Sequence, residues 1–183
     1  MKKSIVFALL FSLAAISPAL AETTVKLNGV HLCCGGCVKG IEKAVSKLDG
    51  TSVECDRQAG TVVVKAGDDA AAKKALAAIG RAGYYGTSEN AKLKIPGRKA
   101  KDTKVTDQRV GGVHLCCGSC VKAVDRVVAK LDGASGHDAK KGAKTFTVKG
   151  NYSLAALQAA FQAEGLNGRA VREKGKGKKK SKK

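Results

Sequence analysis

The chain has 183 residues, which is room for one medium-sized domain or two small ones. Its 34 Lys and Arg residues against 15 Asp and Glu give a formal net charge of +19 at pH 7. After the N-terminal segment no stretch is apolar enough to cross a bilayer, which excludes a membrane-spanning domain in the rest of the sequence.

The N-terminal segment has the three parts of a secretory signal peptide. Lys2 and Lys3 precede an apolar run over residues 5–16, and small residues then surround Ala21. The run is well short of the ~20 residues that span a bilayer, so we predict a cleaved signal peptide over residues 1–21 rather than an anchor. The mature protein is expected in the periplasm or outside the cell, with a net charge of +17 after Lys2 and Lys3 are removed.

An internal repeat divides the remaining chain. Residues 29–50 read GVHLCCGGCVKGIEKAVSKLDG and residues 112–133 read GVHLCCGSCVKAVDRVVAKLDG, with 15 of 22 positions identical. Such similarity at a fixed offset indicates a duplicated unit. We predict one domain over residues 22–90 and a second over residues 106–172.

Each unit shows the same order of predicted elements. Alternating apolar residues predict strands, and apolar residues at helical spacing predict helices. In the first unit we expect strands over 23–32, 51–56, 61–65 and 84–88, and helices over 35–48 and 68–78, the second capped by Asp68. In the second unit we expect strands over 106–115, 136–139, 145–149 and 166–171, and helices over 119–131 and 153–163.

The βαββαβ order predicts an α+β protein with two tandem ferredoxin-like domains. Each would be a four-stranded antiparallel sheet with two helices on one face. Between them, the basic segment 91–105 with Pro96 and Gly97 is predicted to be a linker. The Lys-rich segment 173–183 has too few apolar residues for a core, and we predict a disordered tail that contacts an anionic envelope surface or simply aids solubility. Nucleic acid is not an expected partner of an exported protein.

Six of the seven cysteines form two tight clusters, each between a predicted strand and a predicted helix. The helix N-terminus favours thiolate over thiol, and thiolates bind metal. A Cys-x-x-Cys spacing lets both sulfurs face one ion. The candidate ligands are Cys34 and Cys37 in the first loop and Cys117 and Cys120 in the second.

These loops resemble those of the heavy-metal-associated domain, the family of copper chaperones, copper-ATPase N-terminal modules and the periplasmic mercury-binding protein. The family pattern is Gly-Met-x-Cys-x-x-Cys on the first loop of a βαββαβ fold, and the resemblance implies Cys34, Cys37, Cys117 and Cys120 as soft-metal ligands. Here Leu32 and Leu115 stand at the Met position, where we expect them to pack under the loop.

The loops also carry residues that the family pattern lacks. Cys33 and Cys116 precede the first family cysteine, and His31 and His114 lie two residues earlier. Alternation along a strand predicts that His31 and Cys33 face outward together while Leu32 faces inward. Three thiolates and an imidazole suit Zn²⁺, whereas two or three thiolates suit Cu(I); Hg(II) and Cd(II) would also fit. One ion is expected per domain, and the alternative of one ion between the two loops is not indicated by the sequence.

Other roles of single residues are also considered. The histidines could be surface residues, and the exported dithiols could form disulfides. Cys55, in phase with Val53, is predicted to be buried in the core. Tyr84 and Tyr85 are expected to serve packing, and His137 is expected at the surface.

The leading interpretation is a non-catalytic, exported protein that sequesters a soft metal or passes it to a transporter or an acceptor protein. The alternative is a thiol–disulfide oxidoreductase that uses the two Cys-x-x-Cys motifs. Against it, a hairpin follows the first helix, and no Pro inside a domain can face the dithiol. A third possibility is a structural module in which metal staples the fold, and in that case the apo protein would be unfolded.

Overall fold

The structure is a computed structural model that describes residues 22–97 and 100–171. The predicted signal peptide over 1–21 and the predicted tail over 173–183 lie outside the described residues. Among the described residues, no helix has both the length and the apolar character that crossing a membrane requires.

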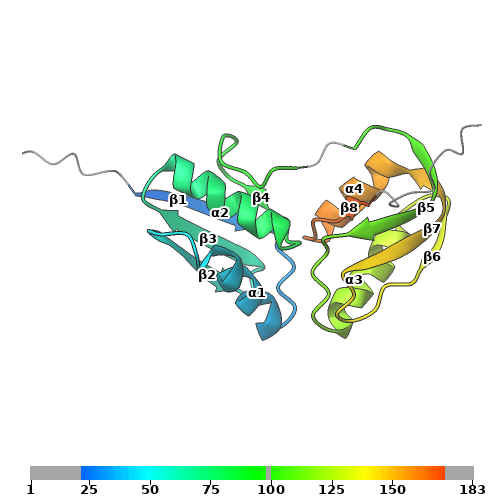
Figure 1. Ribbon diagram of the computed structural model, residues 1–183, viewed down its shortest axis with the longest axis horizontal. Coiled ribbons are helices and arrows are strands. Elements are labelled where there is room, and N and C mark those ends of the chain that lie inside the picture. Colours follow the sequence, from blue (N-terminus) through cyan, green and yellow to red (C-terminus); the bar gives the residue numbers. More distant parts are fainter. Residues whose placement is uncertain (1–21, 98–99, 172–183) are drawn as a thin grey trace, which may run out of the picture.

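The first domain contains four strands and two helices. Its elements in order are β1 (Thr23–Asn28), α1 (Gly35–Val45), β2 (Thr51–Asp56), β3 (Thr61–Ala66), α2 (Asp69–Arg81) and β4 (Thr87–Ser88). The sheet order is β2-β3-β1-β4 and every pairing is antiparallel. The helices α1 and α2 pack against each other and against the sheet (Figure 1).

The second domain repeats this topology. Its elements are β5 (Lys104–Gly111), α3 (Gly118–Ala129), β6 (Ala134–His137), β7 (Thr145–Ser153), α4 (Leu154–Ala163) and β8 (Arg169–Ala170). The sheet order β6-β7-β5-β8 is the counterpart of the first sheet, and it is again antiparallel. The predicted fold class, two tandem ferredoxin-like domains, is therefore confirmed.

The first core forms between the apolar sides of the strands and helices. Val25 and Leu27 of β1 and Val62 and Val64 of β3 alternate inward and are at most 1% exposed. Ile41 of α1 is fully buried against them. Truncating such a residue to Ala costs roughly 2–5 kcal/mol, so the thiol loops rest on a rigid base.

The first strand of each domain ends earlier than expected, and the reason is a glycine. The predicted strands 23–32 and 106–115 stop at Asn28 and Gly111. The next residues, Gly29 and Gly112, have φ values of 71° and 75°, which take the chain out of extended geometry. The segments beyond them become the loops that carry the cysteines.

The last strand of each domain is also short, because its first residues pair with the other domain. Tyr84 forms an antiparallel bridge with Leu166. The Tyr85 amide donates to the Gly165 carbonyl at 2.9 Å, and the Asn167 amide donates to the Gly83 carbonyl at 3.0 Å. Only Thr87–Ser88 and Arg169–Ala170 join their own sheets.

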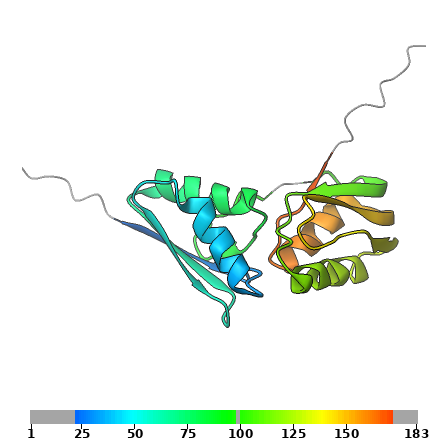
Figure 2. The same ribbon diagram turned by 60° about the horizontal axis from the view of Figure 1, so that its bottom comes forward.

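This interface is nearly symmetric. Gly83-Tyr84-Tyr85-Gly86 and Gly165-Leu166-Asn167-Gly168 occupy equivalent places in the two repeats. Each segment donates to the glycine carbonyl of the other, which is the reciprocal pattern of a two-fold interface within one chain. The two domains therefore lie side by side about an approximate two-fold axis (Figures 1 and 2).

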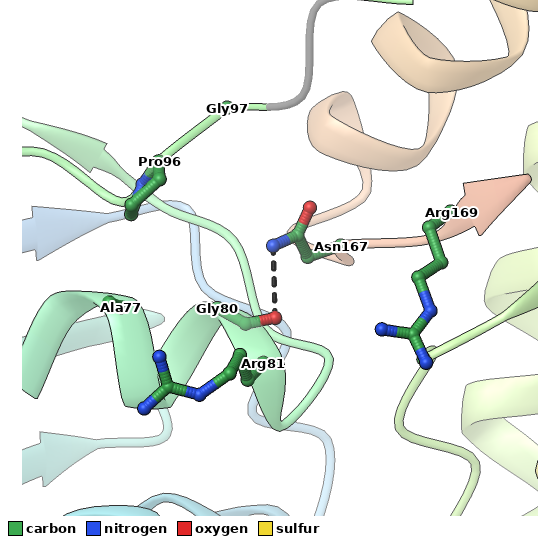
Figure 3. A pocket seen from close by; sticks show the side chains of 8 residues that line it. Ala77, Gly80, Arg81, Pro96, Gly97, Asn167 and Arg169 are labelled. Carbon is green, nitrogen blue, oxygen red and sulfur yellow. Dashed lines mark hydrogen bonds between the residues drawn. The ribbon is translucent and has the colours of Figure 1, made fainter.

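The predicted linker takes part in this packing. Leu93 and Ile95 are each 1% exposed and belong to the core, so segment 91–105 is not merely a tether. Nearby, the Asn167 amide Nδ2 donates to the Gly80 carbonyl at 2.9 Å beside a cleft of about 320 Å³ (Figure 3). Arg81 and Arg169 line this cleft, but the Arg81 side chain extends away from Arg169, so the two guanidinium groups do not converge (Figure 3).

Candidate metal centre

Each thiol loop ends on the first turn of a helix. Cys34 is the N-cap residue of α1 and Cys117 is the N-cap residue of α3, both with extended backbones and no side-chain capping bond. Within each motif the two sulfurs face each other: Cys34 Sγ and Cys37 Sγ are 4.0 Å apart, and Cys117 Sγ and Cys120 Sγ are 3.8 Å apart. Each Cys-x-x-Cys pair is therefore arranged to hold one soft ion between its sulfurs.

The residues before each motif have the predicted orientation. Leu32 and Leu115 are 5% and 4% exposed and belong to the core, as expected for side chains that support the loop. Cys33 and Cys116 are half-buried and face the thiols instead. Each loop thus brings three thiols together.

The two loops meet in space, which the sequence did not indicate. Cys33 Sγ lies 3.3 Å from Cys117 Sγ and 3.6 Å from Cys120 Sγ. Cys116 Sγ lies 3.4 Å from Cys34 Sγ and 3.6 Å from Cys37 Sγ. These distances are far above the ~2.05 Å of a disulfide, and all seven cysteines are free. The six loop thiols form a single cluster at the domain interface, on the side where the first turns of α1 and α3 approach each other (Figure 1).

The cluster contains overlapping sets of three ligand atoms that lie within 4.8 Å of one another. Four such sets occur among the described residues. They are Cys33–Cys34–Cys37, Cys34–Cys116–Cys117, Cys37–Cys116–Cys120 and His31–Cys33–Cys120. Three of the four combine residues of both domains.

The two histidines differ in their surroundings. His31 belongs to a ligand set with Cys33 and Cys120, but His114 belongs to none of the sets found in residues 22–97 and 100–171. Instead the His114 ring packs on Tyr84, with centroids 4.7 Å apart. Burial lowers the pKa of His114, which keeps the ring neutral. Neither Nε2 atom has a hydrogen-bond partner in the described structure.

The thiols have unequal proton affinities. The pKa of Cys34 is lowered to about 7 by its contact with Cys116 and by the amides of Cys37 and Gly36. These contacts outweigh burial, which raises the pKa. The pKa of Cys37 is raised by its contact with the Cys120 thiolate and by burial, while the pKa of Cys120 is lowered, first by Cys37 and then by His31. Burial raises the pKa of Cys116 to about 12.

Six thiolates this close to one another repel, so ionisation of all six is disfavoured unless a cation lies between them. Like charges at such short distances disfavour ionisation, and a bound cation reverses that balance. A metal ion bound here would displace protons from those thiols that are protonated. The arrangement is suited to a positively charged, sulfur-seeking ligand.

Hydrogen bonds from outside the first loop hold the backbone of that loop. The Tyr84 hydroxyl donates to the Cys37 carbonyl at 3.0 Å, and Arg57 donates to the Cys33 carbonyl at 3.3 Å. Tyr84 is fully buried, which confirms the packing prediction, but its role at the thiol loop was missed. No sequence pattern indicates this role, because the hydrogen bond joins residues 47 positions apart in the chain.

Two further single-residue predictions have different outcomes. The prediction of a buried Cys55 is confirmed only in part, because its side chain is half-buried and packs against the core without belonging to it, and Cys55 is in none of the ligand sets among the described residues. The surface assignment of His137 is wrong: its side chain is 9% exposed, and its Nε2 lies 2.7 Å from Asp125 Oδ1. The Ala139 amide donates to its other nitrogen at 3.0 Å. A structural turn, not a ligand site, explains this residue.

Comparison with known proteins bears on the first domain. Residues 24–85 match the heavy-metal-associated domain. The match includes the first thiol loop and both helices of that domain, so the resemblance is confirmed there. A search of curated proteins gives no significant match. Among solved structures, the N-terminal soluble domains of Bacillus subtilis CopA align over 82% of this chain and 94% of that chain, with 16% identity and a TM-score of 0.30.

Proposed function

We propose that this protein is a non-catalytic binder of soft heavy-metal ions that acts outside the cytoplasm. The observation that carries the proposal is the cluster of six free thiols, whose sulfurs lie 3.3–4.0 Å apart. Thiolate sulfur prefers soft ions such as Cu(I), and it also binds Zn²⁺, Cd²⁺ and Hg²⁺. The family match over residues 24–85 supports the same ligand class.

Cu(I) fits the ligands better than Zn²⁺. Structural Zn²⁺ sites are closed, with four ligands, whereas the ligand sets found here have three members and are rich in sulfur. Low-coordinate, all-sulfur surroundings are the preference of Cu(I). Cys34 and Cys37 would bind one Cu(I) ion, and Cys117 and Cys120 would bind another.

The exposure of the sulfurs supports a carrier role. Cys33, Cys34, Cys116 and Cys117 are half-buried, whereas Cys37 and Cys120 are fully buried. A metal held by both kinds of thiol can be attacked by an incoming thiolate from the exposed side. A transporter or an acceptor protein with its own thiolates is the partner that this chemistry requires.

The test is a metal titration of the reduced chain without residues 1–21. Cu(I) and Zn²⁺ are added in the presence of a competing chelator of known affinity, and the Cys34→Ser/Cys117→Ser variant serves as a control. We expect Cu(I) to bind more tightly than Zn²⁺ and the variant to lose at least tenfold in affinity. Weak binding of both ions together with rapid exchange with glutathione disulfide would support the oxidoreductase alternative instead.

A further inference from the structure

We propose that the two loops form one polynuclear centre, in which both domains share a cluster of thiolate-bridged Cu(I) ions. The inference rests on the proposed function, since it requires a soft metal. It goes beyond that function in the number of ions bound per chain and in placing them at the interface between the domains. Two separate domains would hold two independent ions. A shared centre would hold more ions at the interface and would lock the domains together.

Ligand sharing in the structure supports bridging. Five of the six loop cysteines each belong to two of the four ligand sets, whereas Cys117 and His31 each belong to one. A thiolate that serves two ions is a bridge between them. With metal–sulfur distances of about 2.3 Å, three sulfurs around one ion lie about 4 Å apart, close to the spacings found here. The four overlapping sets thus describe up to four bridged ions.

The vicinal cysteines make the sharing possible. Cys33 contacts Cys117 and Cys120 of the other domain as well as Cys37 of its own. Cys116 likewise contacts Cys34 and Cys37 across the interface, and Cys120 within its own domain. This reciprocal pattern gives a reason for the extra cysteine in each loop.

Charge favours monovalent ions in this centre. Six thiolates carry six negative charges, and four Cu(I) ions would leave a net charge of −2. Two ions would leave −4 on a partly buried cluster, which costs more free energy because like charges repel at short range. Each coordinating thiol that is protonated releases its proton to solvent as the ion binds.

Two glycines at the interface provide a way to disturb the shared site without touching a thiol. A Cβ atom at Gly165 would lie 2.4 Å from the Gly29 carbonyl oxygen and 2.4 Å from the His31 amide nitrogen. A Cβ atom at Gly83 would lie 2.5 Å from the His114 amide nitrogen. The Gly83→Ala/Gly165→Ala variant should therefore push the loops apart.

Replacing a glycine of positive φ with alanine strains the backbone wherever it lies, and Gly50 provides a control for this strain. Gly50 has a φ of 62°, similar to the 70° of Gly165, but nothing lies within 4 Å of the position that a Cβ atom would take there. Gly50→Ala should carry the same left-handed strain without a clash at the interface. The comparison isolates the separation of the domains from the strain.

The experiment measures bound copper per chain, copper–copper scattering by X-ray absorption, and the mass of the loaded protein in solution. For the wild type we expect about four Cu(I) ions, a copper–copper signal and a monomer. Cys33→Ser/Cys116→Ser keeps both Cys-x-x-Cys pairs and should bind about half as many ions without that signal. Gly83→Ala/Gly165→Ala should do the same, while Gly50→Ala should behave as the wild type.

The outcomes separate the two proposals. Two ions per chain, no copper–copper signal and no effect of the Cys33→Ser/Cys116→Ser variant would overturn the shared centre and leave metal binding intact. A cluster formed only in a dimer of chains would also overturn it. Absence of tight Cu(I) binding would instead contradict the proposed function. If the glycine variant does not fold, the wild-type signal and the cysteine variant still decide the question.

Discussion

Cys34 Sγ and Cys116 Sγ lie 3.4 Å apart, although 82 residues separate them in the chain. Each belongs to a different domain, and each lies in the loop before the first helix of its domain. The contact depends on the interface between the domains, in which Tyr84 pairs with Leu166 and the His31 amide of the first loop donates to the Gly165 carbonyl at 3.4 Å. The thiol cluster is therefore a product of the domain arrangement, and this relationship can be tested directly.

Oxidation of the metal-free protein should join the domains. Cys34 to Cys116 at 3.4 Å and Cys33 to Cys117 at 3.3 Å are closer than Cys34 to Cys37 at 4.0 Å. Mild oxidant should therefore give interdomain disulfides, identified by mass spectrometry of proteolytic peptides. Closing a loop of about this length stabilises a protein by roughly 4 kcal/mol in the chain-entropy model. Finding only Cys34–Cys37 and Cys117–Cys120 bridges would contradict the arrangement.

The two histidines should respond differently to substitution. His31 lies in a ligand set with Cys33 and Cys120, whereas His114 packs on Tyr84. We expect His31→Ala to weaken metal binding several-fold with little change in folding, because it removes a candidate ligand. His114→Ala should lower the free energy of unfolding by about 1–2 kcal/mol, because it removes a buried aromatic contact. Chelator competition and urea unfolding measure the two effects, and equal affinity losses would argue against the assignment.

Tyr84 should matter for the metal loop as well as for the fold. Tyr84→Phe removes the donor to the Cys37 carbonyl, which costs roughly 1 kcal/mol when the acceptor is buried. Tyr152 in the second domain offers a control, because its buried hydroxyl donates to the Val148 carbonyl at 2.7 Å and accepts from the Gln108 amide at 3.3 Å. Both variants should lose stability in urea, and Tyr152→Phe should lose at least as much as Tyr84→Phe. Of these two variants, only Tyr84→Phe should speed the release of metal to a chelator, since Tyr84 donates to a cysteine carbonyl and Tyr152 does not.

The fold was largely predictable because each element depends on local pattern. The alternation in β3 and the helical spacing in α1 fix which residues face the core. The predicted cap at Asp68 is confirmed, since its Oδ1 accepts from the Ala71 amide at 2.6 Å. The ends of β1 and β5 were misjudged because apolar alternation continues past Gly29 and Gly112, where the backbone turns.

The candidate site was predictable only within each domain. Sequence spacing indicates that Cys34 and Cys37 share an ion, because residues three positions apart at the start of a helix lie close together. It says nothing of Cys34 and Cys116, whose contact depends on how two surfaces dock. Leu93 and Ile95 were missed as core residues for the same reason, because a short apolar pair within a basic segment has no period to reveal its burial.

An ion pair between α3 and α4 should make stability depend on pH. The Glu164 carboxylate accepts hydrogen bonds from Arg126 Nε at 2.8 Å and from Lys130 Nζ at 2.8 Å, and its side chain is 9% exposed. Burial raises the pKa of Glu164, but Lys130 and Arg126 outweigh that effect and lower it below the ordinary value of 4.5. The unfolded chain therefore binds this proton at higher pH than the folded chain does. The stabilisation is present above pH 4.5 and is lost as the pH falls through the folded pKa.

Glu164→Gln should accordingly lower the free energy of unfolding by about 1 kcal/mol at pH 7, because both partners are half-exposed and partly screened. The difference between variant and wild type should shrink as the pH is lowered towards 3. Urea unfolding at a series of pH values measures it. The matched control is Glu54→Gln, because Glu54 pairs with Lys65 on an exposed surface, where its side chain is 66% exposed. That control should show no measurable change, and a pH-independent loss for Glu164→Gln would mean that packing of the side chain, rather than its charge, stabilises the helix pair.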